Sequence, residues 1–243
     1  MNETRNNTVV ILAGGFGTRL SEETILKPKP MVQIGSRPIL WHIIKHYQHY
    51  GFKNFVICLG YKGEYIKSYF KKNSKLFSNL NFRLVSTGLN SLTATRIFKV
   101  RNHLTNTFLL TYGDAVSDIN LSKLILFHKK KKSLFTVSGV IPKSRYGSIK
   151  FNKNSLVTKF KEKKDFQDNF ISGGYFVCDK KIFNYFSKKN EMLEEKPFQK
   201  IQKTKKMFVF KHYGFWQCMD TMRDKLLLEK LWRINPPWKI WKK

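Results

Sequence analysis

The stretch VVILAGGFGTRL, residues 9–20, joins a strand-like apolar run to a loop rich in glycine. The run ends at Gly14 and Gly15, and a third glycine, Gly17, precedes Thr18 and Arg19. Glycine-rich turns after strands often hold phosphate, because bare backbone N–H groups can approach the anion. The loop lacks the Gly-Lys-Ser/Thr ending of a P-loop and the third glycine of a dinucleotide-binding turn. By itself it therefore predicts only an unspecified phosphate site.

Strand and helix patterns alternate around this stretch through the first half of the chain. Near-continuous apolar strands separated by amphipathic helices predict a mostly parallel sheet covered by helices on both faces. Pro38 in the first turn and Gly51 at the end are typical of a helix over 37–51. We expect strands at 8–13, 54–60, 82–87, 107–114 and 134–140, and further helices at 64–72 and 94–103.

The second half of the chain has a different pattern. Three short strands, at 146–151, 156–163 and 171–179, follow one another closely, as in antiparallel pairing. Helical patterns return at 180–189 and 221–232. The sequence thus predicts a single α/β domain over residues 1–243, in which a parallel part is followed by a smaller mixed part that covers a second ligand.

Composition limits the classes of partner. A net charge of +30 predicts attraction to anions, but the lysine runs at 128–132, 161–164 and 203–206 fall where elements meet loops. Neither a zinc-finger spacing nor an aromatic RNA-binding signature is present, so we expect solvated surface lysines and no nucleic-acid partner. The N-terminus lacks an apolar signal region and no apolar run reaches membrane-spanning length. We therefore expect a cytoplasmic protein without membrane insertion.

The residues at strand ends carry the chemistry. Ligands in open α/β sheets bind beyond the carboxyl ends of the strands, where the glycine loop and the YGD tip both lie. Cations there can neutralise a polyphosphate, and acids can hold a hard divalent cation. Together they suit transfer at phosphorus, which depends mainly on positioning and charge neutralisation. The candidates are the cations Arg19 and Lys29, the acids Asp114 and Asp220, and the adjacent pair Glu162 and Lys163.

The motifs LAGGFGTRL, KPKPM, YGD, EK and MDT occur here in the order typical of the sugar-1-phosphate nucleotidyltransferases. Longer blocks, among them ICLGYKG, GFWQCMDTMRDK and PPWKIW, resemble the glucose-1-phosphate cytidylyltransferases almost from end to end. The resemblance implies a Rossmann-like nucleotidyltransferase fold and the reaction of CTP with α-D-glucose 1-phosphate to give CDP-glucose and pyrophosphate. It also implies Mg²⁺ as cofactor, a homo-oligomer, and a role at the start of dideoxysugar synthesis for surface polysaccharide such as O antigen.

The resemblance also assigns roles along the chain. It implies a nucleotide-binding part at about 8–140, a sugar-phosphate-binding part at about 141–220, and a C-terminal helix and tail at 221–243. Arg19 and Lys29 are the expected catalytic residues, and Asp114 and Asp220 the expected Mg²⁺ ligands. The expected nucleotide-binding residues are Leu12, Ala13, Gly14, Gly15, Gly17, Thr18, Arg19, Lys29, Thr87, Gly88, Thr93 and Gly113. The expected sugar-phosphate-binding residues are Gly147, Glu162, Lys163 and Gly174.

Three features differ from the family pattern. Ala94 and Thr95 replace two glycines near the expected base pocket, Ala115 replaces a glycine after Asp114, and the segment 71–86 is shorter than usual. Two alternatives therefore stay open at the level of sequence. One is the same chemistry with another nucleotide, such as UTP or dTTP, or with another sugar 1-phosphate. The other is a catalytically weak homologue that binds nucleotide.

Overall fold

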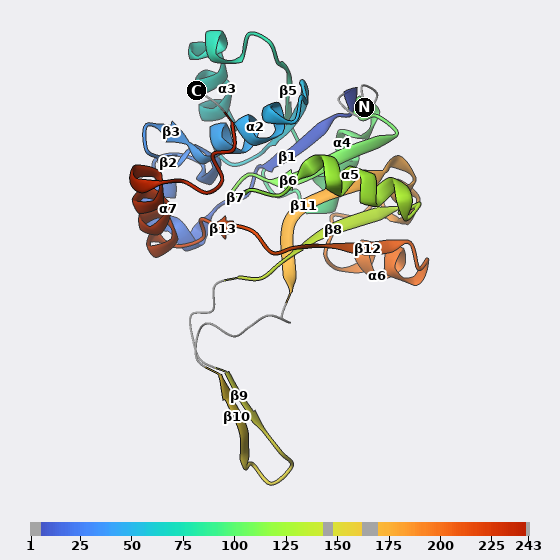
Figure 1. Ribbon diagram of the computed structural model, residues 1–243. Coiled ribbons are helices and arrows are strands. Elements are labelled where there is room, and N and C mark those ends of the chain that lie inside the picture. Colours follow the sequence, from blue (N-terminus) through green and yellow to red (C-terminus); the bar gives the residue numbers. More distant parts are fainter. Residues whose placement is uncertain (1–5, 143–147, 162–169, 242–243) are drawn as a thin grey trace.

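A seven-stranded sheet forms the centre of the protein in a computed structural model, which describes residues 6–142, 148–161 and 170–241 (Figure 1). Its strand order is β12-β8-β11-β6-β1-β4-β5. The strands are β1 (Val9–Ala13), β4 (Asn54–Leu59), β5 (Asn81–Ser86), β6 (Thr107–Tyr112), β8 (Phe135–Val140), β11 (Ile171–Asp179) and β12 (Met207–His212). Pairing is parallel from β6 through β1 and β4 to β5, and again between β8 and β12. β11 runs antiparallel to both of its neighbours, β6 and β8.

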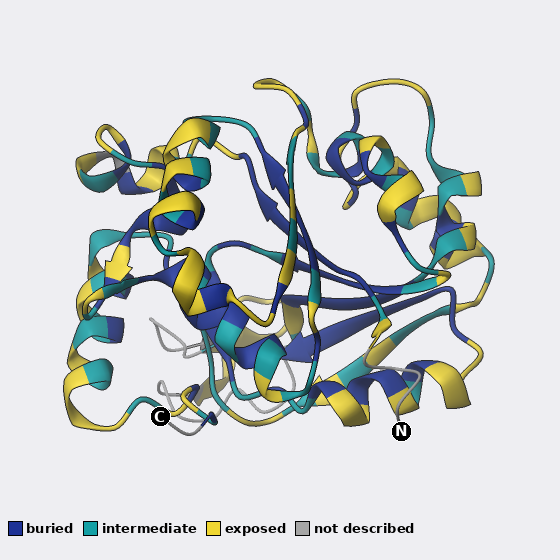
Figure 2. Cartoon of the chain, turned by 90° about the horizontal axis from the view of Figure 1, so that it is seen from above, coloured by how far each residue is buried: buried dark blue, intermediate teal, exposed yellow. Residues whose placement is uncertain are grey.

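Helices cover both faces of this sheet, which confirms the expected α/β class. Alternate residues of β1 enter two separate apolar clusters: Val9 and Ile11 belong to one, and Val10 and Leu12 to the other. A strand packed on both faces must be apolar at every position, which explains its unbroken run. Figure 2 shows the buried sheet between helices whose outer surfaces are exposed. The helices are α1 (Ser21–Thr24), α2 (Ile39–His49), α3 (Gly63–Lys72), α4 (Thr93–Lys99), α5 (Leu121–Lys130), α6 (Lys196–Lys203) and α7 (Met222–Ile234).

Short elements lie at the edge of the sheet where the parallel strands end. β7 (Ala115–Ser117) pairs antiparallel with β13 (Trp216–Cys218), and β2 (Gln33–Ile34) pairs with β3 (Arg37–Pro38). The β7–β13 pair brings two segments that are remote in sequence to one place. Short 3₁₀ helices occur at η2 (Thr18–Leu20), η3 (Lys29–Met31), η4 (Ser74–Phe77), η5 (Arg101–His103) and η6 (Lys180–Tyr185).

The second half of the chain differs in part from its expected arrangement. β9 (Ser148–Phe151) and β10 (Val157–Lys161) form the predicted antiparallel hairpin, which extends away from the central sheet (Figure 1). The third strand of that group, β11, does not pair with the hairpin. It enters the central sheet instead, because its residues Tyr175–Cys178 are apolar and buried between β6 and β8.

Two helix predictions need correction. The expected helix over 180–189 is only the 3₁₀ helix η6, because the Lys189 carbonyl and the Glu191 N–H bond to the Thr95 hydroxyl, and the Ser187 N–H donates to the Glu191 carboxylate. The expected helix over 94–103 divides into α4 and η5. α5, α6 and β12 were not predicted, although Asn120 caps α5 in the usual way, accepting a hydrogen bond from the backbone of Lys123. None of the helices in the described residues is long and apolar enough to cross a membrane.

Candidate active site

The glycine loop follows β1 at the switch point of the sheet, where parallel strands lie on both sides of β1. β1 has β4 on one side and β6 on the other, and such a switch point opens a crevice beyond the strand ends. Gly17 adopts a positive φ of 69°, and a Cβ there would lie 2.9 Å from the Cβ of Lys29. The third glycine of the loop is thus required both by its backbone conformation and by the close approach of the lysine.

A cavity of about 350 Å³ lies over this loop. That volume is within the usual range for small-molecule sites. The predicted residues that line it are Leu12, Ala13, Gly14, Gly15, Gly17, Thr18, Arg19, Lys29, Thr93, Gly113 and Asp114. Its lining also includes residues that sequence reasoning missed: Phe16, Pro30, Leu89, Asn90, Ser91, Leu92, Arg96, Tyr112 and Met192.

Lys29 organises one end of the cavity. Its ammonium group is 2.7 Å from Oδ2 of Asp114 and also contacts Oδ1 of Asp220. Arg19 reaches the same acid from the exposed side, with Nη1 3.1 Å from Oδ2 of Asp220. Burial alone would lower the pKa of Lys29, but the two carboxylates outweigh it and raise the pKa above its ordinary value. Lys29 is therefore a buried cation that keeps its charge at neutral pH.

The β7–β13 pair brings the two acids together. Asp114 lies in the turn between β6 and β7, and Asp220 follows β13, so the register that matches Ala115 with Cys218 sets them side by side. The N–H of Met219 also donates to the carbonyl of Asp114 at 2.8 Å. Sequence placed both acids at strand ends, but only the pairing of these short strands makes them neighbours.

A buried carboxylate holds Asp220 in position. Oδ2 of Asp224 accepts hydrogen bonds from the backbone N–H groups of Asp220 and Thr221, at 3.2 and 2.9 Å, and from the Thr221 hydroxyl at 2.8 Å. Thr221 and Asp224 form the capping box that begins α7. The start of the C-terminal helix therefore fixes the backbone that carries Asp220.

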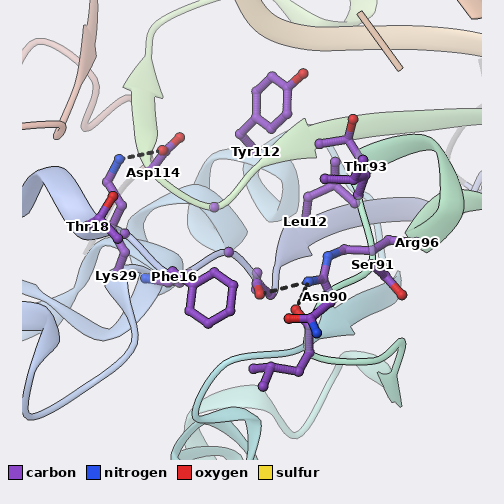
Figure 3. Close-up of a pocket in the computed structure, with 18 of the residues that line it drawn as sticks. Leu12, Phe16, Thr18, Lys29, Asn90, Ser91, Thr93, Arg96, Tyr112 and Asp114 are labelled. Atoms are coloured by element: carbon purple, nitrogen blue, oxygen red, sulfur yellow. Dashed lines mark hydrogen bonds and ion pairs between the residues drawn. The ribbon is translucent and has the colours of Figure 1, made fainter. Parts of the chain in front are cut away.

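Arg96 organises the other end of the cavity. Its guanidinium donates to the carbonyls of Leu59, Gly88, Gly14 and Leu89 at 2.8–3.1 Å, and to the Thr87 hydroxyl at 2.7 Å. In the part of the chain that the structure describes, no carboxylate pairs with it. Burial accordingly lowers the pKa of Arg96 from its ordinary value. Figure 3 shows this side chain reaching the loop that follows Leu12.

Two predicted nucleotide-binding residues lie behind this arginine rather than on the cavity wall. Thr87 is buried, and its hydroxyl donates to the carbonyl of Leu59 at 2.7 Å while accepting from Arg96. Gly88 offers its carbonyl to the same guanidinium. Both therefore support the wall through Arg96 and are not among the residues that line the cavity. The signal that could have found Arg96 is a charged residue directly before the apolar pair Ile97 and Phe98 in TRIFKV.

Most of the expected sugar-phosphate-binding residues lie outside the part of the chain that the structure describes. Gly147, Glu162 and Lys163 lie outside the described residues. Gly174 lies on β11 with a positive φ of 73°, and a Cβ there would approach the Tyr112 ring to 2.6 Å. It is therefore next to β6 and near the cavity, but does not line it.

The two acids could hold a divalent cation. One oxygen of each faces the same point, which the ammonium of Lys29 marks. Mg²⁺ commonly takes one or two carboxylates and completes its shell with phosphate oxygens and water. Among the described residues no third carboxylate, histidine or cysteine joins them. The donor set therefore fits a metal shared with a phosphate ligand and does not form a closed all-protein site.

Comparisons with known proteins agree with this fold. The family model for nucleotidyl transferases matches residues 8–223. The chain belongs to the nucleotidyl transferase family. Within it, the chain is 40% identical to the glucose-1-phosphate cytidylyltransferase of Salmonella typhimurium, over 96% of this chain and 98% of that enzyme. This confirms the resemblance drawn from the sequence motifs.

More distant relatives share the fold. The mannose-1-phosphate guanyltransferase of Aspergillus oryzae is 28% identical, over 89% of this chain and 62% of that protein. The crystal structure of HddC from Yersinia pseudotuberculosis superimposes with a TM-score of 0.72 at 24% identity, covering 93% of this chain and 99% of that one. The same protein complexed with GMP-PN gives a TM-score of 0.70. The nucleotidyltransferase fold is therefore established for this chain.

Proposed function

We propose that this chain transfers the cytidylyl group of CTP to α-D-glucose 1-phosphate, giving CDP-glucose and pyrophosphate. The observation that carries the proposal is the meeting of the glycine loop with Arg19, Lys29 and Asp114 at one end of a single cavity, where Arg19 and Lys29 also contact Asp220. The choice of CTP and glucose 1-phosphate follows the named activity of the 40%-identical Salmonella enzyme.

The chain's own residues supply binding and charge neutralisation. Backbone N–H groups of the glycine loop face the triphosphate, while Lys29 and Arg19 neutralise the charge that develops as pyrophosphate leaves. The sugar phosphate attacks the α-phosphorus in line. A phosphate monoester is already largely ionised near neutral pH, so the step needs neither a protein nucleophile nor a general base. Asp114 and Asp220 would hold Mg²⁺, which when bound offsets negative charge on the α-phosphate.

The sugar end of the site is proposed from the resemblance. Glu162 binds sugar hydroxyls, Lys163 binds the phosphate of glucose 1-phosphate, and Gly147 and Gly174 let the backbone approach the sugar. Replacing Lys163 by alanine should then raise KM for glucose 1-phosphate and leave KM for CTP unchanged. An effect confined to CTP would contradict this assignment.

A panel of nucleotides tests the proposal. The protein is incubated with glucose 1-phosphate, Mg²⁺ and each of CTP, UTP, dTTP, ATP and GTP, and released pyrophosphate is measured. Pyrophosphate from CTP, with CDP-glucose identified by mass, is the expected result. Turnover with UTP or dTTP but not CTP would change the nucleotide, and binding of CTP without turnover would indicate a weak homologue. Omitting Mg²⁺ should abolish turnover.

The wider setting is also proposed. We place the reaction in the cytoplasm, in a homo-oligomeric enzyme, with CDP-glucose as the precursor of dideoxysugars for surface polysaccharide such as O antigen. Support for these points is the resemblance to the cytidylyltransferases. Light scattering coupled to size-exclusion chromatography measures the number of subunits directly, and a monomeric mass would contradict the oligomer.

A further inference from the structure

The cavity has two chemically different ends. Thr18, Lys29 and Asp114 lie together at one end, whereas Asn90, Ser91 and Arg96 lie at the opposite end (Figure 3). If the triphosphate occupies the charged end, as the proposed function requires, the base must extend toward the other. The inference below rests on that proposed function, and concerns what the second end offers to a base.

Most polar groups at this end are already engaged. Arg96 takes the carbonyls of Gly88 and Leu89, at 2.8 and 3.0 Å. Ser91 donates to the carbonyl of Thr87 at 2.5 Å and accepts from the Lys99 ammonium at 3.0 Å. In the conformation described, the terminal nitrogens of the guanidinium and this hydroxyl already have partners and are not free to select a base.

Asn90 differs from these groups. Its side chain is exposed at the cavity wall and, within the described residues, its amide has no hydrogen-bond partner. A carboxamide presents one acceptor and two donors. It can accept from the 4-amino group of cytosine while donating to N3, and a rotated amide can meet the N3–H and O4 of uracil. Such paired contacts to the Watson–Crick edge are a usual way to read an unstacked base.

A second asparagine holds the backbone of the first. Nδ2 of Asn190 donates to the carbonyl of Asn90 at 2.9 Å, and Oδ1 of Asn190 accepts from the N–H of Leu92 at 2.8 Å. One side chain thus binds the backbone on both sides of Ser91, as a paired strand would. It reaches this wall from the segment 187–195, which connects η6 to α6.

The segment 187–195 is itself fixed to α4, so Asn190 is held in place. The N–H of Glu191 donates to the Thr95 hydroxyl at 3.1 Å, and the N–H of Ala94 donates to the Glu191 carbonyl at 3.2 Å. The Thr93 hydroxyl accepts from the N–H of Leu193 at 2.7 Å. Three backbone contacts next to Asn190 therefore keep its amide against the wall.

We propose that the Asn90 side chain contacts the pyrimidine base, and that Asn190 is a positioning residue that acts through Asn90. Because the amide of Asn90 can rotate, it contributes affinity for cytosine and uracil alike. Discrimination between the two bases must then come from other groups.

A double-mutant cycle tests the pair. Asn90→Ala, Asn190→Ala and the double variant are compared for kcat, for KM with CTP and for KM with glucose 1-phosphate. Loss of two neutral hydrogen bonds should raise KM for CTP about 10-fold in each single variant. The double variant should be no worse than the single ones, because both remove the same contact. KM for glucose 1-phosphate and kcat should be unchanged.

Controls separate this role from simple destabilisation. Asn79 is exposed and does not line the cavity, so Asn79→Ala should behave as wild type in every measurement. Thermal unfolding of Asn90→Ala should match wild type, since its amide has no partner to lose. Unchanged KM for CTP in Asn90→Ala would overturn the inference. Additive effects in the double variant, or a rise in both KM values for Asn190→Ala, would overturn the positioning role.

The test of the Asn90 contact can be distinguished from the test of the proposed function. If wild-type protein releases no pyrophosphate with any nucleotide, the proposed function fails. Calorimetric titration of CTP with Mg²⁺ into wild type and Asn90→Ala then measures the base contact alone. An equal Kd in the two proteins would overturn the inference, and a 10-fold weaker Kd in the variant would support it.

Discussion

Two buried cations stand at the two ends of the cavity, and they are held in opposite ways. Lys29 is 9% exposed and contacts two carboxylates, whereas Arg96 is 5% exposed and contacts four carbonyls and one hydroxyl. The pKa of Lys29 is raised by its acids despite burial, while burial lowers the pKa of Arg96.

The difference between Lys29 and Arg96 indicates that the two ends of the cavity have different functions. Charges that neutralise one another can exchange partners when a metal or a polyphosphate binds. The Lys29 end is therefore suited to the transfer reaction at phosphorus. Both terminal nitrogens of the Arg96 guanidinium already donate to neutral acceptors, so they are not free to bind an anion. The Arg96 end is therefore suited to form the cavity wall against which the base binds. Variants at each end should accordingly affect different measurements.

The largest effect is expected for Asp220→Asn. The substitution keeps the shape of the side chain but removes half of the acidic pair and one partner of both Arg19 and Lys29. We expect kcat to fall by roughly 10²- to 10³-fold with little change in the melting temperature. Steady-state pyrophosphate release at saturating Mg²⁺ measures it. The exposed Glu64→Gln is the matched control, and normal turnover by Asp220→Asn would refute a role in metal binding.

Arg96→Lys should act mainly on stability. A single ammonium cannot reproduce the planar fork that joins Gly14, Leu59, Thr87, Gly88 and Leu89, so several buried acceptors lose their donor. We expect a loss of about 3 kcal/mol in the free energy of unfolding, measured by urea denaturation. KM for CTP should rise as well, because the wall of the cavity loosens.

Arg83 supplies the control for that variant. It is exposed on β5 and distant from the cavity, so Arg83→Lys should leave both quantities unchanged. If Arg96→Lys reduced kcat as far as Asp220→Asn and left stability intact, the contrast between the two ends would be wrong.

Sequence reasoning predicted the first end much better than the second. Gly14, Arg19 and Lys29 lie within one short stretch, and both acids were placed at the ends of elements, so the residue types at this end could be predicted. The β7–β13 pairing that makes the two acids neighbours could not. The wall around Arg96 is built from backbone carbonyls and from the segment 187–195. Backbone contacts between segments some 100 residues apart leave no pattern of side-chain types in the sequence.

The fold also has parts that could be predicted from the sequence and parts that could not. β1 and its parallel neighbours were predicted because burial on both faces demands an uninterrupted apolar run. The helix expected over 180–189 was wrong because tertiary contacts of the Lys189 and Glu191 backbone with Thr95 override local helical preference. The central position of β11 was missed because a strand's partners depend on topology, which the alternation of residues does not encode.

The pH dependence of stability offers a smaller test of the Lys29 end. Since the folded pKa of Lys29 is raised above its ordinary value of 10.5, the folded chain holds this proton more tightly than the unfolded chain. Its contribution to stability is complete below pH 10.5 and is lost as the pH rises through the raised pKa. Unfolding by urea is compared for wild type and Lys29→Met from pH 8 to about 11.5.

The two proteins should differ by about 2 kcal/mol at pH 8, and the difference should shrink above the ordinary lysine value. Other lysines titrate in both proteins and cancel in the comparison. A difference that stays constant across this range would mean that the carboxylates do not hold the charge of Lys29, and the distinction between the two cations would disappear.

The smallest effect is expected for Tyr175→Phe. The Tyr175 hydroxyl is buried and donates to the carbonyl of Ala115, the residue after Asp114, at 3.0 Å. This is a single neutral hydrogen bond, so its loss should lower the free energy of unfolding by about 1 kcal/mol. Asp114 keeps its contacts with Lys29 and, through its backbone, with Met219, so kcat should fall only a few-fold. The exposed Tyr213→Phe is the control. A loss of kcat as large as that of Asp220→Asn would show that long-range backbone contacts set the geometry of the Lys29 end as well. The two ends would then differ in charge but not in how they are built.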